Sequence, residues 1–392
     1  MNILFVYERK IISNFGGVER VTLLLSGELQ KRGHNIIFLS VGPHEWNETK
    51  TEDQGFEQIY MPLSMPAFKE KYDKLIDDYK ISIVFFQGIH PTVLETLDLT
   101  GSMVKKIVTL HMNPYSISPF EKYIKRITPW RSLTFKGKLY KLLALSSPGS
   151  FRKINNRRIE LKFNKIMESA DKFVVLSEKF VSRILQFSPK LNRGKLGAIN
   201  NPNTFIPTDN DESNEKKNIV LFVGRLSNPQ KNVTGFIDVW KEFSVNNPGW
   251  EAIVVGDGED REYIIKYAGR KKVERLSFEG NRKNIEDYYK QSKILCMTST
   301  YEGWGMVLPE AMAYGCVPVA YNSFDSITDI IDSGENGILI KPFDIEEMAA
   351  ALGLLASDEN MRKAMAASGK EKINQFNVNK IVDQWEILFN SL

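Results

Sequence analysis

The sequence predicts an α/β protein with two parallel-sheet domains. Short apolar runs alternate with amphipathic stretches along the whole chain, which is typical of repeated βα units. The chain has 392 residues, more than one ordinary hydrophobic core accommodates. A polar segment at residues 207–218, PTDNDESNEKKN, interrupts the apolar periodicity and predicts a linker or surface loop. We therefore expect two domains joined near residue 210, with a ligand cleft between them.

The individual elements follow from the apolar pattern. The first half contains five runs expected to form buried strands, namely NILFVY, NIIFLSV, ISIVFF, KIVTLH and KFVVLS. After the linker come six more, IVLFVG, EAIVVG, LSFEG, KILCMTS, CVPVA and GILI. Helical spacing predicts helices around three apolar sets, which are Val18, Val21, Leu25 and Leu29; Phe236, Ile237, Trp240 and Phe243; and Ile381, Trp385, Leu388 and Phe389.

Composition favours a soluble globular protein, with 42% hydrophobic and 26% charged residues. No apolar run approaches the roughly 20 residues of a membrane span, and the N-terminus enters a strand directly, so we expect a cytoplasmic protein. Cys296 and Cys316 both fall in expected strands, where a free thiol is usually a small core residue. No Cys/His metal spacing occurs.

Charge is distributed unevenly. Residues 1–200 carry 31 basic and 19 acidic side chains, whereas residues 201–392 carry 21 and 29. Between Lys122 and Lys165 there are 13 Lys or Arg and one acid, interleaved with aromatic and aliphatic residues. Such a block is either solvated surface or a face that docks on anionic lipid, and we favour the membrane surface. The residues expected on that face are Lys122, Lys125, Arg126, Trp130, Arg131 and Lys138.

Two carboxylates stand out in residues 298–320, TSTYEGWGMVLPEAMAYGCVPVA. Pro309 predicts the first position of a helix that runs to about Gly315, a C-terminal cap. Glu302 would then lie in a glycine-rich loop after a strand and Glu310 in the first turn of the helix. A parallel sheet binds ligands at the carboxyl ends of its strands, where a helix start suits phosphate and a carboxylate suits sugar hydroxyls. The alternative is that Glu310 stabilises its own helix dipole and Glu302 is solvated.

Three further sets of residues follow strands. Gly16 and Gly17 allow backbone N–H groups to approach a phosphate, although a glycine pair also marks ordinary turns. Arg225 and Lys231, in FVGRLSNPQKN, combine a bidentate fork with a mobile charge and suit a diphosphate, or simply face solvent. His111 either hydrogen-bonds a sugar or is a satisfied residue at a strand end.

One motif is expected to be inert. Asp209 and Asp211, in DND, have the Asp-x-Asp spacing that holds a divalent metal and a nucleotide diphosphate in some glycosyltransferases. Here the motif lies in a polar connector rather than after a strand, so we expect no metal there.

The order and setting of the glycines, Arg225, Lys231 and EGWGMVLPE resemble the retaining glycosyltransferase family 4, which has the GT-B fold of two Rossmann-like domains facing across a cleft. The resemblance covers essentially the whole chain, with ADKFVVLSE, AINNPN and VGDGED also matching. It implies an acceptor-binding domain over residues 1–205, with a basic insert at about 120–165. A nucleotide-sugar donor domain over 206–377 and a helix over 378–392 that returns to the first domain would complete the chain.

The resemblance also implies residue roles. Arg225 and Lys231 would bind the donor diphosphate, with Glu302 at the donor sugar and Glu310 at the ribose. The catalytic residues would be His111, Glu302, Arg225 and Lys231. The donor-binding residues would be Gly16, Gly17, Arg225, Lys231, Asn281, Arg282, Glu302, Gly303, Trp304, Gly305, Met306, Val307 and Glu310.

The implied activity is metal-independent transfer from a nucleotide-diphosphate sugar, with no cofactor and with retained configuration. Two cations and a helix terminus would stabilise the leaving diphosphate, which would help deprotonate the acceptor hydroxyl. A lipid-diphosphate-linked glycan at the inner face of the cell membrane, in capsule, exopolysaccharide or lipopolysaccharide synthesis, would explain the basic first half. No nucleic-acid partner is expected.

Three rival functions are weighed against this. A nucleotide-sugar epimerase of the same fold would need carboxylates placed for proton transfer or hydrolysis at the sugar. A non-catalytic nucleotide-sugar-binding protein would be expected to lose Arg225, Lys231 or Glu302, and the chain retains all three. An NAD-dependent dehydrogenase is disfavoured because no G-x-G-x-x-G follows the first strand.

Overall fold

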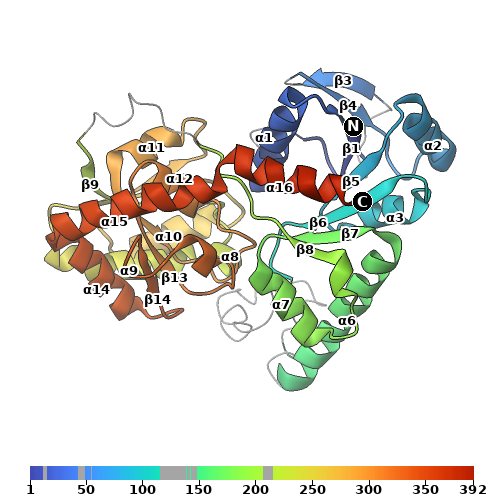
Figure 1. Cartoon of the computed structure of the whole chain (residues 1–392). Coiled ribbons are helices and arrows are strands. Elements are labelled where there is room, and N and C mark those ends of the chain that lie inside the picture. Colours follow the sequence, from blue (N-terminus) through green and yellow to red (C-terminus); the bar gives the residue numbers. More distant parts are fainter. Residues whose placement is uncertain are drawn as a thin grey trace. The chain divides into compact units, whose positions relative to one another are not determined.

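The computed structural model describes residues 1–11, 16–42, 49–53, 55–114, 138, 142, 148–205 and 215–392. Two compact units form along the chain, each around its own sheet (Figure 1). The first unit comprises residues 1–114, 156–204 and 376–392, and the second comprises 115–155 and 205–375.

The first unit contains an eight-stranded sheet in the order β3-β4-β2-β1-β5-β6-β7-β8. Every neighbouring pair is parallel except β3 with β4. The strands are β1 (Asn2–Tyr7), β2 (Asn35–Ser40), β3 (Thr49–Asp53), β4 (Phe56–Tyr60), β5 (Ile83–Gln87), β6 (Lys105–Leu110), β7 (Lys172–Val175) and β8 (Leu196–Ala198). The helices are α1 (Gly17–Lys31), α2 (Phe68–Asp78), α3 (Pro91–Leu99), α6 (Pro148–Ser169, in this unit from residue 156), α7 (Glu178–Phe187) and α16 (Val378–Asn390).

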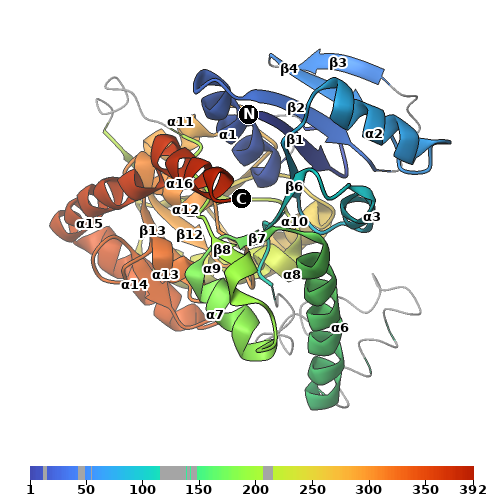
Figure 2. The same cartoon turned by 45° about the vertical axis from the view of Figure 1, so that its right-hand side comes forward.

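The last helix completes the core of the first unit. Phe5 and Phe85 lie on the paired strands β1 and β5, with stacked rings whose centroids are 4.8 Å apart. Trp385 and Phe389 of α16 cover Phe85, at centroid distances of 4.7 and 6.3 Å. Figures 1 and 2 both show α16 alongside α1, with which it packs. The predicted return of the C-terminal helix to the first domain is confirmed.

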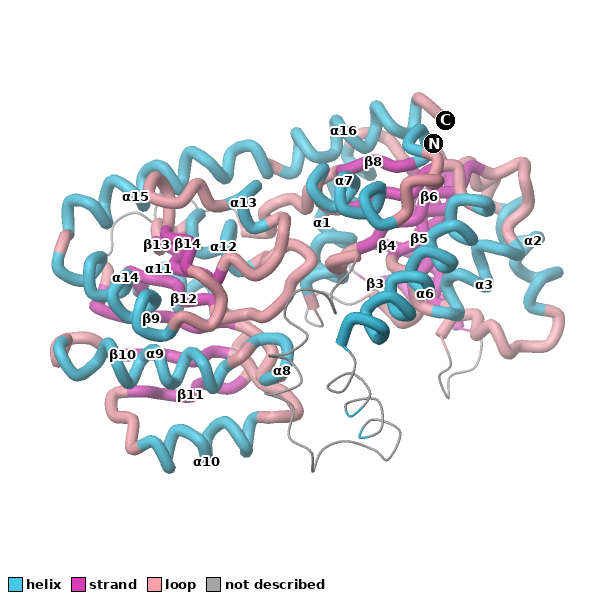
Figure 3. Tube along the Cα trace, turned by 90° about the horizontal axis from the view of Figure 1, so that it is seen from below, coloured by secondary structure: helices cyan, strands magenta, loops and turns pink. Residues whose placement is uncertain are grey.

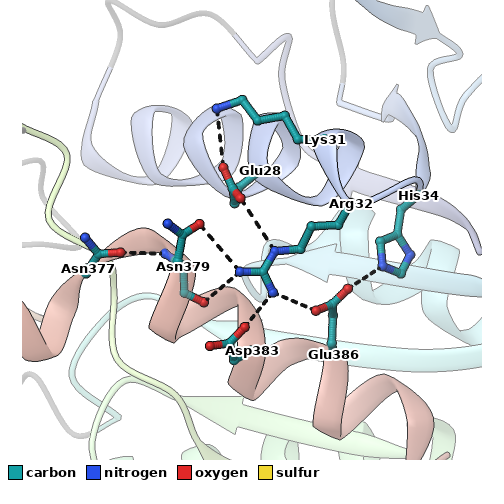
Figure 4. A network of polar contacts seen from close by, with 8 residues as sticks. All are labelled: Glu28, Lys31, Arg32, His34, Asn377, Asn379, Asp383 and Glu386. Atoms are coloured by element: carbon teal, nitrogen blue, oxygen red, sulfur yellow. Dashed lines mark hydrogen bonds and ion pairs between the residues drawn. The ribbon is translucent and has the colours of Figure 1, made fainter.

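A polar network joins α1 to α16 beside this aromatic contact (Figure 4). Arg32 Nη1 lies 2.6 Å from Asp383 Oδ1 and 2.7 Å from Glu386 Oε2. Arg32 Nη2 donates to the backbone oxygen of Asn379 at 3.1 Å, and His34 Nε2 lies 2.9 Å from Glu386 Oε1. The network therefore fixes α16 along its length as well as by its apolar face.

The second unit contains a six-stranded, fully parallel sheet in the order β11-β10-β9-β12-β13-β14, drawn in magenta in Figure 3. The strands are β9 (Lys217–Val223), β10 (Glu251–Val255), β11 (Leu276–Gly280), β12 (Ser292–Met297), β13 (Val317–Tyr321) and β14 (Ile338–Ile340). The helices are α8 (Asn228–Lys231), α9 (Val233–Asn246), α10 (Arg261–Lys271), α11 (Glu286–Gln291), α12 (Val307–Ala313), α13 (Ile327–Ile330), α14 (Ile345–Ser357) and α15 (Glu359–Lys372).

The core of the second unit follows the predicted apolar periodicity. Phe236, Trp240 and Phe243 of α9 are buried against β9 and β10, together with Met348 and Leu352 of α14. The indole N–H of Trp240 donates to the backbone oxygen of Glu274 at 2.9 Å, so this large side chain is buried without an unpaired donor. The fold class is therefore α/β with two parallel-sheet units, as predicted.

The structure differs from the sequence-based prediction in three strands, in the start of one helix and in the position of one cysteine. The strands β3, β4 and β8 were not predicted, because β3 is a polar edge strand, TKTED, and β8 has only three residues. Helix α12 begins at Val307 rather than at Pro309, which is its third residue. Proline is tolerated at this position because the N–H groups of the first turn of a helix have no intrahelical partner. Cys316 lies one residue before β13 rather than in it, although both cysteines are free and buried.

The end of α12 agrees with the prediction, whereas the linker differs from it. Gly315 ends α12 as predicted, with φ of +70°, and the Cys316 N–H donates to the Ala311 carbonyl at 2.9 Å. The expected linker is shorter, because β9 already begins at Lys217, and residues 206–214 lie outside the described part of the chain. In the described residues, no helix combines the length and apolar character that crossing a bilayer requires.

Candidate active site

The centre of the second sheet is a topological switch point. From β9 the chain proceeds to β10 and β11 on one side, then returns to β12 on the other side of β9 and continues to β13 and β14. The loops after β9 and β12 therefore leave the same sheet edge in opposite directions. Ligands bind at such points in open α/β sheets. Arg225 and Lys231 follow β9, and Glu302 follows β12.

These three residues are brought together through side-chain contacts. Lys231 Nζ lies 2.6 Å from Glu302 Oε1, and both side chains are largely buried, at 16% and 9% exposed. Gln230 Nε2 donates to Glu302 Oε2 at 3.3 Å, and Gln230 Oε1 accepts from Arg225 Nη2 at 3.3 Å. Arg225 itself is exposed. Glu302 is therefore not simply solvated, because each of its oxygens has a partner.

Two buried threonines hold the backbone behind this cluster. Thr300 donates from its N–H to the Gln230 carbonyl at 2.7 Å, and from Oγ1 to the Pro229 carbonyl at 2.7 Å. Thr298 Oγ1 donates to the Asn232 carbonyl at 3.0 Å. The short helix α8 is thus attached to the loop after β12 by side chains that point back from that loop.

The loop before α12 is closely packed. Gly305 has φ of +79°, and a Cβ there would lie 3.1 Å from the Phe324 ring, so glycine is required for both backbone and space. Ser326 Oγ donates to the Gly303 carbonyl at 2.9 Å, and Trp304 is buried. Met306 precedes α12 and Val307 is its first residue.

Glu310 occupies the first turn of α12, but its side chain has no exposed surface. The hydroxyl of Tyr289, which is also fully buried, donates to Glu310 Oε2 at 2.9 Å. The rings of Phe205 and Tyr314 lie beside Tyr289, with centroids 6.1 and 6.2 Å away. The two glutamates therefore have different surroundings, one in an ion pair and one hydrogen-bonded to a buried tyrosine.

Asn281 and Arg282 follow β11, which is the second strand from β9, and both are exposed. Arg282 Nη2 lies 2.9 Å from Glu279 Oε2, and the Tyr288 hydroxyl donates to the same oxygen at 3.1 Å. Arg282 lowers the pKa of Glu279 through this contact. Neither Asn281 nor Arg282 has a described contact with Arg225, Lys231 or Glu302.

In the first unit, Gly16 and Gly17 follow β1 at the start of α1. Gly16 precedes the first helical residue, and a Cβ on it would lie 2.8 Å from Glu19 Oε2. Glu19 is buried and accepts a hydrogen bond from the Tyr7 hydroxyl at 3.3 Å. The glycine therefore leaves room for a buried carboxylate. Sequence reasoning did not single out Glu19, which stands two residues after the glycine pair.

His111 directly follows β6. Its Nε2 contacts Oε1 of Gln87, a buried residue at the end of the neighbouring strand β5. Nδ1 of His111 is buried without a hydrogen-bond partner in the described part of the chain. Burial lowers the pKa of His111 to about 4, so the ring is neutral near pH 7.

The remaining predicted residues lie mostly outside the description. This holds for Lys122, Lys125, Arg126, Trp130 and Arg131, and also for Asp209 and Asp211. Lys138 is described and exposed, as are Lys153, Arg157 and Arg158 of α6. Across the described ranges, no three or more His, Cys, Asp or Glu side chains form a group that could hold a metal ion.

The chain matches known proteins over its whole length. Residues 15–202 match Glycosyltransferase Family 4, and residues 208–372 match Glycosyl transferases group 1. An uncharacterized glycosyltransferase of Haemophilus influenzae is 25% identical over 379 residues, covering 96% of each chain. A Campylobacter jejuni protein is 30% identical over 390 residues, covering 95% of this chain and 94% of that one. It is named GalNAc-alpha-(1->4)-GalNAc-alpha-(1->3)-diNAcBac-PP-undecaprenol alpha-1,4-N-acetyl-D-galactosaminyltransferase.

Solved structures identify the fold. Anabaena HepE, crystallised with UDP and glucose, has a TM-score of 0.73 at 18% identity, and the match covers 100% of both chains. At this identity the likeness shows the fold alone, and that fold is GT-B. Taken with the two family matches and the 30% identical relative, it shows that this chain belongs to glycosyltransferase family 4 and is a glycosyltransferase.

Proposed function

We propose that the chain transfers a hexosyl group, with retained configuration and without a metal ion, from a nucleotide-diphosphate sugar to a lipid-linked glycan. The observation that carries this proposal is the Lys231–Glu302 ion pair beside Arg225 at the switch point of the second sheet. Two cations and one carboxylate thus lie after the carboxyl ends of two neighbouring strands, β9 and β12.

Each residue has a defined task in this proposal. Arg225 and Lys231 bind the diphosphate and stabilise the charge that develops on it as the glycosidic bond breaks. Glu302 accepts hydrogen bonds from hydroxyls of the donor sugar, and Glu310 accepts hydrogen bonds from the hydroxyls of the ribose. His111 is kept neutral by burial, so it can form a hydrogen bond with a sugar without adding charge to the site. Gly16 and Gly17 offer backbone N–H groups to the diphosphate.

Retention follows from a front-face displacement in this scheme. The bond to the diphosphate loosens through an oxocarbenium-like state, and the departing phosphate takes the proton of the acceptor hydroxyl. The acceptor and the departing phosphate then share one face of the sugar, so no protein nucleophile is needed. Asn281 and Arg282 frame the nucleotide base in this proposal.

A lipid-linked acceptor is supported by two facts of different kinds. The Campylobacter jejuni relative has an undecaprenol-linked acceptor in its name. In this chain, the basic excess lies in residues 1–200, and it includes Lys153, Arg157 and Arg158 at exposed positions of α6. Cationic side chains near an anionic bilayer each favour binding by about 1 kcal/mol. We propose that the protein works at the inner face of the cell membrane in polysaccharide synthesis.

Donor turnover tests the catalytic proposal. Purified protein is incubated with UDP- and GDP-sugars, with and without EDTA and bacterial lipid extract, and free nucleoside diphosphate is measured. Release from one donor, increased by lipid and unaffected by EDTA, is expected. Arg225→Ala and Glu302→Ala should lower it at least 100-fold, whereas Lys363→Ala, at an exposed site on α15, should not. Binding without release from any donor would instead favour a sensor.

Vesicle sedimentation tests the membrane proposal. Replacing Lys125, Arg126, Arg131 and Lys138 together with Glu should abolish sedimentation with anionic vesicles. A control of equal charge change replaces four exposed lysines outside the basic block, Lys241, Lys266, Lys272 and Lys363, with Glu. Unchanged sedimentation of the first variant, or equal loss in the control, would remove the membrane surface from the proposal.

A further inference from the structure

The side chain of Gln230 contacts both a proposed diphosphate-binding cation and the proposed sugar-binding carboxylate. Its Oε1 accepts from Arg225 and its Nε2 donates to Glu302, each at 3.3 Å. Arginine can only donate and an ionised carboxylate can only accept, so the partners fix the orientation of the amide. No other orientation satisfies both neighbours.

The backbone of Gln230 is held independently of its side chain. Its carbonyl accepts from both the N–H and the hydroxyl of Thr300, at 2.7 and 3.0 Å, and its N–H donates to the Ser227 carbonyl at 3.2 Å. Gln230 Nε2 also lies 3.5 Å from the Tyr301 carbonyl. The amide therefore extends from a fixed point between two loops, which is what a positioning residue requires.

Donor binding is expected to change which residues contact the carboxylate of Glu302. Lys231 engages Oε1 of Glu302 and Gln230 engages Oε2. A diphosphate carries more charge than one carboxylate and attracts the ammonium group of Lys231, which sits on a flexible stem. As Lys231 moves toward the phosphates, Glu302 loses its strongest partner, and the amide of Gln230 still holds it.

We propose that Gln230 is a positioning residue that keeps Glu302 in place for the donor sugar while Lys231 is drawn to the diphosphate. The proposal rests on the function proposed above. It assigns Gln230 to recognition of the sugar through Glu302 rather than to recognition of the nucleotide, and it requires an amide at this position instead of a carboxylate.

The two substitutions at this position have different expected effects. Gln230→Met removes both hydrogen bonds at similar length, so UDP or GDP should bind within threefold of wild type. The additional affinity of the nucleotide sugar should be lost, and kcat should fall about 10- to 100-fold. Gln230→Glu places a carboxylate against Glu302 and beside Arg225, so it should weaken both the nucleotide and the nucleotide sugar.

The experiment is calorimetric titration of the full chain with UDP, GDP, UDP-glucose, UDP-GalNAc and GDP-mannose, alongside turnover of whichever sugar is a donor. Gln375→Met, an exposed glutamine of the same unit, is the matched control and should behave as wild type. Equal losses for nucleotide and nucleotide sugar in Gln230→Met, or no loss at all, would overturn the role of Gln230 alone. Failure of the wild-type chain to bind any nucleotide sugar would overturn the proposed function.

Discussion

Arg32 Nη1 donates to Glu386 Oε2 at 2.7 Å, although the two residues are 354 positions apart in the sequence (Figure 4). The same guanidinium contacts Asp383 and the backbone of Asn379 on α16, so the residue that caps the C-terminus of α1 holds three residues of the last helix. The side chains of Arg32 and Glu386 are about one quarter exposed, which places the network at the edge of the core.

The first prediction concerns this network. Arg32→Met should lower the free energy of unfolding by about 2 kcal/mol, because charge-assisted hydrogen bonds to two carboxylates are lost at a partly shielded site. Urea unfolding and hydrogen exchange of α16 measure it. Lys31→Met, at the neighbouring position, removes one exposed ion pair and should change stability by less than about 0.5 kcal/mol. Equal effects of the two substitutions would contradict the prediction.

The network also has a pH dependence with a defined sign. His34 and then Arg32 lower the pKa of Glu386 below its ordinary value. The stabilisation is therefore complete above the pKa of an unfolded glutamate, about 4.3, and is lost as the pH falls through the folded pKa. Glu386→Gln should reduce the loss of stability between pH 5 and pH 3 relative to wild type. A difference confined to higher pH would exclude this origin.

The second prediction is that Lys231 and Glu302 depend on each other for stability. Lys231→Met leaves a carboxylate whose side chain is 9% exposed without its cation and should cost about 3 kcal/mol. The double variant Lys231→Met with Glu302→Gln should be less destabilised than the sum of the single variants by at least about 1 kcal/mol. A double-mutant cycle in urea measures the coupling, and strict additivity would mean that the ion pair is unimportant in solution.

The third prediction separates the two glutamates. Tyr289→Phe removes the hydroxyl that donates to the fully buried Glu310 and should cost about 1 to 2 kcal/mol, while raising the KM for the donor. Tyr263→Phe, at a tyrosine on α10 that is 37% exposed, is the matched control and should alter neither quantity. A loss of stability with unchanged KM would leave Glu310 a structural residue.

The fourth prediction concerns His111. Burial lowers its pKa to about 4, whereas an unfolded histidine titrates near 6.5, so the unfolded chain binds more protons between these values. Stability should therefore fall as the pH drops from 7 to 5, by about 2 kcal/mol from this group. His111→Gln should flatten the curve over that interval. Because the chain has four histidines, NMR titration can follow His111 directly, and a pKa near 6.5 would contradict the prediction.

Much of the fold could be predicted because buried parallel strands are short, continuous apolar runs. NILFVY and KILCMTS correspond closely to β1 and β12. The polar strand β3 could not be predicted, because it is defined by antiparallel pairing with β4 rather than by its own pattern. Pro309 predicts a helix start two residues later than the observed start of α12, because proline is tolerated anywhere in a first turn.

The candidate site could be predicted only in part. Arg225, Lys231 and Glu302 stand out as charged residues in loops after strands. The position of β12 beside β9, on which their contact depends, is a property of strand order that no local pattern contains. Gln230 carries no charge and forms its contact with a residue 72 positions away, so it gave no signal. The surroundings of Glu310 were equally hard to predict, because its hydrogen-bond donor Tyr289 belongs to a different helix.

The place of α16 in the first unit bears on how the protein is made. Phe85 of β5 is covered by Trp385 and Phe389, which leave the ribosome some 300 residues later, since synthesis proceeds from the N-terminus. All strands of the second sheet, from Lys217 to Ile340, are synthesised before that helix. The core of the unit that is synthesised first therefore cannot be completed until the last helix has been made, whereas every strand of the second sheet precedes that helix in the chain.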